Sequence, residues 1–228
     1  MIVWNYRGAA GKDFFRFRKY YIDIYKPKLY AIMETRCDPV KLQTPLQKMG
    51  FHKFILVENT GYAGGIIVAC TEDNLKIELI RKRDQSIHMQ VANDRGQEWL
   101  FTVVYASPNE ILRKQLWENM RMVAATMVIS WLVAGDFNDI AYTNEKKGGG
   151  HVSTRKCSTF RNNMEACNLS DLRARGSSYT WRGPIYHSGQ HIYERLDRDI
   201  SNEDWRLMFT EAQVKVLTSV DFFIITRS

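Results

Sequence analysis

The chain has 228 residues, 45% of them hydrophobic, and it carries 32 lysines and arginines against 25 aspartates and glutamates, a formal net charge of +7. This length suffices for one sizeable hydrophobic core, and no Pro/Gly/Ser-rich linker divides it, so we expect a single domain over residues 1–228. No apolar run could span a bilayer and no signal peptide is evident, so we expect an intracellular protein, nuclear or cytoplasmic, with no membrane partner. The basic excess favours a polyanionic partner such as nucleic acid, although many ordinary proteins share it.

The cysteine pattern excludes the common zinc sites. The spacing of the four cysteines matches no zinc-ligand motif. Cys70 ends the apolar run GIIVAC, a position typical of a buried residue. We therefore expect free thiols rather than disulfides at Cys37, Cys70, Cys157 and Cys167.

The first part of the chain alternates strand-like and helix-like segments. Apolar runs and helical spacing of aromatic residues predict, in order, the strand Ile2–Trp4, the helix Phe14–Tyr25, the strand Leu29–Met33 and the helix Val40–Met49. Asn5 and Glu34 directly follow the two strands. Pro27 ends the first helix, whereas Pro45 lies inside the second.

The middle of the chain contains consecutive strand-like segments without helices between them. Short runs rich in β-branched and aromatic residues follow one another, separated by turn-forming segments such as TGYAGG, TEDN and ANDRG. They predict successive strands at Phe54–Val57, Gly65–Cys70, Leu75–Arg81, Ile87–Val91 and Trp99–Tyr105. Strands so crowded along the chain favour antiparallel hairpins.

The remainder returns to alternating elements. Leu112, Leu116, Met120 and Val123 lie on one side of a helix predicted over Glu110–Thr126. After it we expect a buried strand Trp131–Ala134, a flexible loop at 144–154, a helix near Lys156–Cys167, strands at Tyr179–Trp181 and Ile192–Ile200, a short helix Asn202–Phe209 and a final strand Phe222–Ile225. These elements indicate an α/β (α+β) fold, a four-layer sandwich in which two mixed or antiparallel sheets face each other with helices outside.

Acids and amides fall where the predicted strands end. Asn5, Glu34, Asp136 and Asn138 each come at or just after the end of an apolar strand, where ligand groups converge in layered α/β folds. Asp197 lies inside a strand candidate, where a buried carboxylate needs a cationic partner or a metal. A phosphodiester hydrolase needs such groups, because carboxylates hold Mg²⁺ and the attacking water while amide and tyrosine donors stabilise charge on the phosphoryl oxygens.

Each of these residues also has an ordinary structural explanation. Asn5 and Asp136 could cap a helix or shape a turn. Glu34 could form a surface ion pair, and Tyr105 could be a core aromatic residue. The glycines at 148–150 favour a flexible loop over a phosphate-binding one. The order of the motifs is therefore more informative than any one residue.

Six short motifs occur in a defined order: WN at 4–5, METR at 33–36, VYASP at 104–108, GDFN at 135–138, YTW at 179–181 and ERLDR at 194–198. With them, essentially the whole chain resembles the endonuclease/exonuclease/phosphatase superfamily. More narrowly, WNYRGAA, VAGDFNDI, NEKKGGG and ISNEDWRLMF are spelled much as in the endonuclease domain of plant LINE-type (non-LTR) retrotransposon polyproteins. The resemblance implies a Mg²⁺-dependent endonuclease that nicks one strand of DNA.

The resemblance also implies which residues bind the metal and the substrate. Glu34 would be the main Mg²⁺ carboxylate, with Asn5 beside it and Asp221 as a further ligand, and Mn²⁺ could replace Mg²⁺. Thr180 and Arg36 would bind the substrate, which is DNA.

The resemblance assigns the catalytic roles to four other residues and to Asn5. Asp136 would orient or activate the attacking water. Asn138 and Tyr105 would hold the scissile phosphate and stabilise its transition state, and Asp197 would support a catalytic histidine.

The last motif departs from the family pattern. The family closes with Ser-Asp-His before an apolar strand, whereas this chain reads TSVDFFII at 218–225. Asp221 replaces the histidine in an ungapped alignment, and Phe222 replaces it after a one-residue shift. Both alignments lose the imidazole, so we expect impaired cleavage.

Two other functions stay open. One is a catalytically dead remnant that still binds nucleic acid through basic residues, with candidates at Lys12, Arg16, Arg18, Lys146, Lys147, Arg155 and Lys156. The other is a phosphatase acting on a small phosphorylated substrate, which the retrotransposon-like spelling disfavours.

Overall fold

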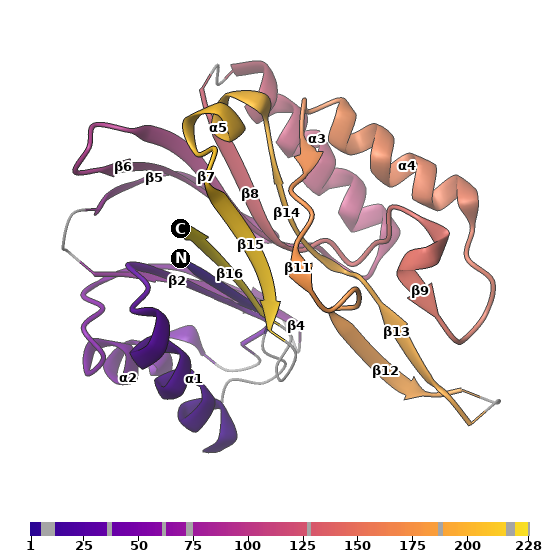
Figure 1. Ribbon diagram of the computed structural model, residues 1–228, viewed down its shortest axis with the longest axis horizontal. Helices are drawn as coiled ribbons and strands as arrows, with labels where there is room; N and C mark the ends of the chain where they lie inside the picture. Colours follow the sequence, from indigo (N-terminus) through magenta and orange to yellow (C-terminus); the bar gives the residue numbers. More distant parts are fainter. Residues whose placement is uncertain are drawn as a thin grey trace.

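The computed structural model describes residues 1–5, 12–35, 38–60, 63–71, 75–126, 129–186, 189–217 and 222–227. Within them, two large β-sheets face each other, with helices α1 and α2 outside one sheet and α3 and α4 outside the other (Figure 1). The sandwich of two mixed sheets between helices is the architecture that the alternating elements predict.

The first sheet joins both ends of the chain. Its order in the described residues is β11 (Arg175–Gly176), β15 (Ala212–Leu217), β16 (Phe222–Arg227), β1 (Ile2–Asn5), β2 (Leu29–Met33), β4 (Ala63–Cys70) and β3 (Lys53–Thr60). β1 and β2 are parallel, as are β11 and β15, and the other neighbours are antiparallel. On the outside lie α1 (Lys12–Tyr25), the 3₁₀ turn η1 (Pro39–Leu42) and α2 (Gln43–Gln47).

The second sheet contains the middle strands. Its order is β10 (Ser170–Asp171), β14 (Asp197–Ser201), β8 (Trp131–Asp136), β7 (Glu98–Tyr105), β6 (Ser86–Asn93) and β5 (Leu75–Arg83). Only β7 and β8 are parallel among these described neighbours. Its outer face packs against α3 (Glu110–Thr126) and α4 (Thr154–Glu165), so β8 is buried on both faces.

A small third sheet and two short helical elements complete the described structure. A small sheet of β12 (Trp181–Ile185), β13 (His191–Glu194) and β9 (Lys146–Lys147) projects from one end of the sandwich (Figure 1). The 3₁₀ turn η2 (Thr143–Glu145) precedes β9, and α5 (Glu203–Met208) follows β14. In the described part of the chain, no helix is long and apolar enough to cross a membrane.

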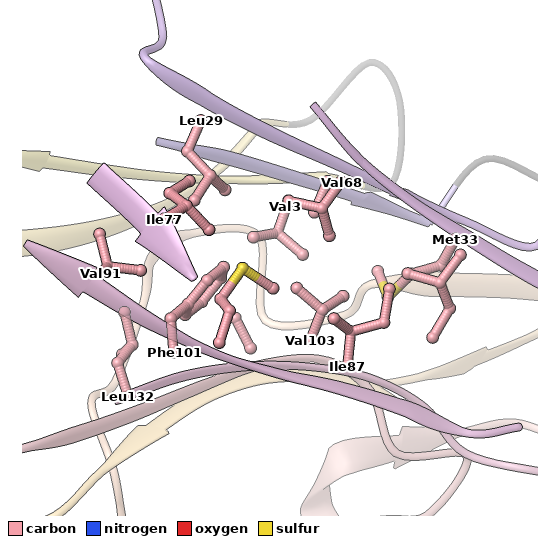
Figure 2. Packing of buried hydrophobic residues seen from close by; sticks show 14 of the residues in the cluster. Val3, Leu29, Met33, Val68, Ile77, Ile87, Val91, Phe101, Val103 and Leu132 are labelled. Carbon is pink, nitrogen blue, oxygen red and sulfur yellow. The ribbon is translucent and has the colours of Figure 1, made fainter. Parts of the chain in front are cut away.

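The main core fills the space between the two sheets. Val3 and Met33 of the first sheet point toward Ile87, Phe101 and Val103 of the second (Figure 2). Each strand places alternate residues on this face, which is why both sheets bury one complete set of side chains. A second cluster lies under α3 and α4, where aromatic rings pack with centroids less than 6 Å apart in the group Trp117, Phe137 and Phe160.

Some predicted elements differ from the structure. The expected strand Ile192–Ile200 is two strands, β13 and β14, in different sheets, because the N–H groups of Leu196 and Asp197 both bond to a threonine hydroxyl at the junction. The expected helix Val40–Met49 is only η1 and α2, with Pro45 in the first turn of α2, where a missing N–H costs little.

Other differences concern single side chains and short strands. Leu112 is exposed, because Arg113 takes the buried position in the first turn of α3. The loop at 144–154 contains β9, and the strand expected at Tyr179–Trp181 begins only at Trp181. The sequence patterns missed β15 and the two-residue strands. As expected, Cys157 and Cys167 are buried free thiols and Cys70 is buried, while Cys37 lies outside the described residues.

Candidate active site

The strand register brings the predicted site residues to one end of the sandwich. In the first sheet, Asn5 lies beside Met33 on parallel strands, and Glu34 follows Met33. In the second sheet, Asp136 is flanked by Tyr105 on parallel β7 and by Asp197 directly opposite on antiparallel β14. Since paired residues of neighbouring strands point to the same face, Tyr105, Asp136 and Asp197 share one face of this sheet.

A hydrogen bond connects the two groups. Asn5 Nδ2 donates to Asp136 Oδ2 at 2.6 Å, although the residues are 131 positions apart. Both side chains are buried, with 5% of Asn5 and 3% of Asp136 exposed. Met33 lies close as well, since its Sδ is 3.0 Å from where a Cβ would stand on Gly135. The ends of β1, β2 and β8 therefore meet.

The Gly135-Asp136-Phe137-Asn138 turn fixes the Asp136 carboxylate. Its second oxygen, Oδ1, accepts the backbone N–H of Asn138 at 2.7 Å. Asn138 has a φ of +47°, in the left-handed region that asparagine tolerates better than most residues, and its Nδ2 donates to the carbonyl of Ala106 at 2.6 Å. Gly135 has a φ of +146°, and a Cβ there would lie 1.9 Å from the carbonyl oxygen of Val104. The motif is thus required both for the close approach of β8 to β7 and for the orientation of its carboxylate.

Thr180 holds the backbone that carries Asp197. Its buried hydroxyl accepts the N–H groups of Leu196 at 3.0 Å and Asp197 at 2.9 Å. These contacts place Asp197 at the start of β14, opposite Asp136. Binding of substrate by Thr180 stays a prediction.

Glu34, directly after β2, has an uncommon backbone conformation. Its φ is +52°, which costs a non-glycine residue free energy, and the residue is buried, with 7% of it exposed. Two other predicted site residues, Arg36 and Asp221, lie outside the described residues.

The donor set at this end suits a hard divalent cation. Asn5 Oδ1 is buried and accepts no hydrogen bond from the described residues, and the Glu34 carboxylate belongs to the neighbouring strand end. Among the described residues, no group of three or more His, Cys, Asp or Glu side chains could hold a metal. Mg²⁺ takes oxygen ligands, one or two of them carboxylates, and keeps several waters. The oxygen donors of Asn5 and Glu34 therefore fit Mg²⁺.

Behind the site lies a buried network of two acids and two arginines, which sequence reasoning missed. Arg198 alternates with Asp197 along β14, so it points to the opposite face, and its guanidinium is completely buried. Its Nη1 donates to Asp171 at 2.8 Å and to Glu145 at 3.0 Å, while its Nη2 donates to the second Glu145 oxygen. Arg195 contacts the same two acids at 2.8 and 3.2 Å.

This network anchors the loop between β8 and β9. Burial raises the pKa of Glu145, but the hydrogen bond and charge of Arg198, together with the backbone N–H donors of Ala141 and Tyr142, lower it, so the net pKa lies below the usual value. Glu145 also accepts the N–H groups of Ala141 and Tyr142, and its carbonyl accepts the N–H of Arg195. The loop is thereby attached to the junction that precedes Asp197.

The described imidazole nearest in sequence to Asp197 is engaged elsewhere. In the projecting hairpin, His191 has Nδ1 2.8 Å from the carbonyl oxygen of Gly183 and Nε2 2.7 Å from Arg182. The ring also lies edge-on to Tyr193, at a centroid distance of 6.3 Å. His187 lies outside the described residues. His191 therefore does not supply the histidine that the family motif would place beside Asp197.

No protein-family model and no curated protein sequence matches the chain. Solved structures do resemble it. An AP endonuclease, LMAP from Leishmania major, has 12% sequence identity and a TM-score of 0.74, covering 100% of this chain and 87% of its own. The endonuclease domain of TRAS1, a telomere-specific non-LTR retrotransposon, has 15% identity and a TM-score of 0.70, covering 98% and 97%.

A third similar structure is the 3′ phosphatase NExo from Neisseria, which was solved bound to a product DNA hairpin. It has 15% identity and a TM-score of 0.69, covering 100% of this chain and 98% of that one. Structural similarity at such low sequence identity shows the fold alone. The specific likeness to plant LINE endonucleases stays a prediction. The chain therefore has the α/β sandwich fold of these three structures, an AP endonuclease, a retrotransposon endonuclease domain and a 3′ phosphatase.

Proposed function

We propose that this chain is a divalent-metal-dependent phosphodiester hydrolase of retrotransposon origin, which nicks DNA slowly because its terminal histidine is missing. The observation that carries the proposal is the buried hydrogen bond between Asn5 and Asp136. It joins a candidate metal ligand in one sheet to a candidate base in the other, at the edge where Glu34, Tyr105 and Asp197 also end or begin strands.

The residues divide into two chemical groups. Glu34 and Asn5 Oδ1 would hold Mg²⁺, or Mn²⁺, and the bound ion would supply positive charge to the phosphate oxygens. Asp136, oriented by N–H donors from Asn5 and Asn138, would accept a proton from the attacking water. Asn138 and Tyr105 would bind the phosphate and stabilise its developing charge. Asp221, Thr180 and Arg36 are proposed as further metal and substrate contacts.

The missing histidine predicts a low rate of DNA cleavage. In the proposed site Asp197 lies opposite Asp136, and the family's closing histidine has no counterpart in 218–225, which read TSVDFFII. Removing one transition-state donor typically lowers the rate by about 100- to 1000-fold. We therefore propose weak cleavage as the residual activity of an otherwise assembled site.

The surface beside the site suits a polyanionic strand. The projecting β12–β13 hairpin carries Arg182 together with exposed Ile185 and Tyr186, and exposed Lys147 lies on the adjacent β9. Lysine and arginine side chains neutralise phosphates, and aromatic side chains stack on bases. That NExo was solved with a DNA hairpin supports DNA as the partner. A DNA substrate also implies an intracellular location, nuclear or cytoplasmic.

Plasmid nicking tests the proposal directly. Supercoiled plasmid incubated with the protein and Mg²⁺ or Mn²⁺ should become open circular, and EDTA should abolish the reaction. Asp136→Ala and Glu34→Gln should each reduce nicking to the background, whereas Arg121→Met, on α3 and paired with Asn163 of α4, should not. Nicking that persists in Asp136→Ala would show a contaminating nuclease and contradict the proposal.

Restoring the missing group separates a damaged enzyme from another function. Phe222→His, and separately Val220→Asp with Asp221→His, should increase nicking by about 10-fold or more if the fold is otherwise assembled. A chain that binds DNA in a salt-dependent way but never cuts it, even after this restoration, would instead be a DNA-binding remnant. The absent histidine is the observation that favours this second function.

A further inference from the structure

One buried arginine contacts both of the loops that carry the candidate site. Arg113, in the first turn of α3, is 8% exposed. Its Nη1 donates to the carbonyl oxygens of Ser107 at 2.9 Å and Pro108 at 2.7 Å, in the loop after β7. Its Nε lies 3.6 Å from Asp139 Oδ2, in the loop after β8. The guanidinium thus bridges the two loops.

The same two loops determine where Asn138 lies. Asn138 Nδ2 donates to the carbonyl of Ala106, next to the first Arg113 acceptor, and Ala106 N donates back to the carbonyl of Asp136 at 2.7 Å. Asn138 also donates its backbone N–H to the Asp136 carboxylate. A shift of one loop against the other would therefore change the position of the Asn138 amide relative to that carboxylate.

A guanidinium is the group that these acceptors require. Its donors lie in one rigid plane, so a single arginine can address two carbonyls and a carboxylate at once, whereas a lysine ammonium cannot match that arrangement. The hydrogen bonds to the two carbonyl oxygens, at 2.9 and 2.7 Å, are shorter than the 3.6 Å contact with Asp139. The two carbonyl contacts are therefore the stronger part of the connection.

We propose that Arg113 is a positioning residue, which holds the Ser107–Pro108 segment against Asp139 and so fixes the amide of Asn138 beside Asp136. The effect of Arg113 on cleavage rests on the proposed function. The effect of Arg113 on the geometry of the two loops does not, so the effect on cleavage and the effect on geometry can be tested separately.

Hydrogen exchange tests the geometric part in the absence of any substrate. The variants are Arg113→Met and, as a matched control, Arg121→Met, which removes a partly buried guanidinium from the same helix. In Arg113→Met the amides of Ala106 and Asn138 should exchange about 10-fold faster or more, while Val133 in the centre of β8 exchanges as in the control. Equal exchange in both variants, or an equal acceleration at Val133, would overturn the proposal.

Single-turnover cleavage tests the catalytic part. With saturating DNA, Arg113→Met should cut about 10- to 100-fold more slowly, the loss expected for a small misplacement of reacting groups, and should bind DNA within about threefold of the parent. Arg113→Lys should not restore the rate, and added guanidinium ion should restore part of it in Arg113→Ala. A rate like that of Arg121→Met, or a matching loss of DNA affinity, would contradict a positioning role. A parent chain that never cuts DNA would refute the proposed function, and the exchange measurement would still decide the role of Arg113.

Discussion

The side chains of Asn5 and Asp136 meet at 2.6 Å although they end strands of two different sheets. Each sheet therefore supplies one half of the candidate site, and neither half is complete by itself. The Asn5 amide reaches Asp136 only when the two sheets are packed against each other. The geometry of the candidate site therefore depends on that packing.

Removing the Asn5 amide should therefore affect stability as well as cleavage. Asn5→Ala removes the Asn5 donor from a buried carboxylate oxygen of Asp136, which should lower the free energy of unfolding by about 1–3 kcal/mol. Asn163→Ala, which removes a partly buried asparagine contact between α3 and α4, should cost less than about 1 kcal/mol. Urea denaturation of both variants measures the difference. Equal losses would mean that the Asn5–Asp136 hydrogen bond contributes no more to stability than the Arg121–Asn163 hydrogen bond does.

The strand ends of the site could be predicted because they follow a simple local pattern. Asn5, Glu34 and Asp136 each come after an apolar run; the register of the first sheet places Asn5 beside Met33, which Glu34 follows, and a hydrogen bond joins Asn5 to Asp136 in the second sheet. Arg113 and Arg198 could not be found in this way, because a charged residue between apolar ones is normally solvent-exposed. Their partners lie far away in sequence, 53 positions from Arg198 to Glu145, and only the folded chain brings them together.

The boundary between β13 and β14 could not be predicted either, because it too depends on a residue that is distant in sequence. The apolar and polar residues of 192–200 are compatible with one continuous strand. Thr180, 17 positions before Asp197, accepts the backbone donors that a continuous ladder would use. A hydrogen bond to a distant side chain leaves no periodic signal in the segment that it interrupts.

The buried network behind the site should be costly to break at one residue. Arg198→Met would remove the fully buried one of the two guanidinium groups that contact Glu145 and Asp171, leaving these acids to Arg195, and should lower the free energy of unfolding by about 3 kcal/mol. Lys156→Met breaks an exposed ion pair to Glu110 and should change it by less than about 1 kcal/mol. Chemical denaturation of both variants gives the comparison. Similar small effects would mean that the network contributes little to stability.

The turn that carries Asp136 predicts a strong requirement for glycine. In Gly135→Ala the new Cβ would meet the Val104 carbonyl oxygen at 1.9 Å, at a φ of +146°, so we expect a loss of at least about 3 kcal/mol and loss of the Asp136 geometry. Gly150→Ala places its Cβ in open space and should be nearly neutral. Thermal unfolding of the two variants distinguishes these outcomes, and a Gly135→Ala protein as stable as Gly150→Ala would contradict the close approach of Gly135 to β7.

A buried acid on β14 should make stability depend on pH. Asp199 is 2% exposed, and neither carboxylate oxygen has a hydrogen-bond partner among the described residues. Burial raises its pKa from 3.8 to about 8, with the charge of Asp171 raising it further and that of Arg195 opposing the rise. The folded protein therefore holds a proton that the unfolded chain releases near pH 4.

Because this acid has the higher pKa in the folded state, the folded chain binds more protons than the unfolded chain between about pH 4 and pH 8. The contribution of Asp199 to stability is then fully favourable below pH 4 and declines as pH rises through this window, by an amount on the order of a few kcal/mol. Asp199→Asn keeps the shape without the titration, so its advantage over the parent should grow from pH 4 to pH 8 and level off above it. Urea denaturation of both proteins across this range measures that difference. A difference independent of pH would mean that Asp199 is ionised in the folded protein and that a compensating partner stabilises its charge.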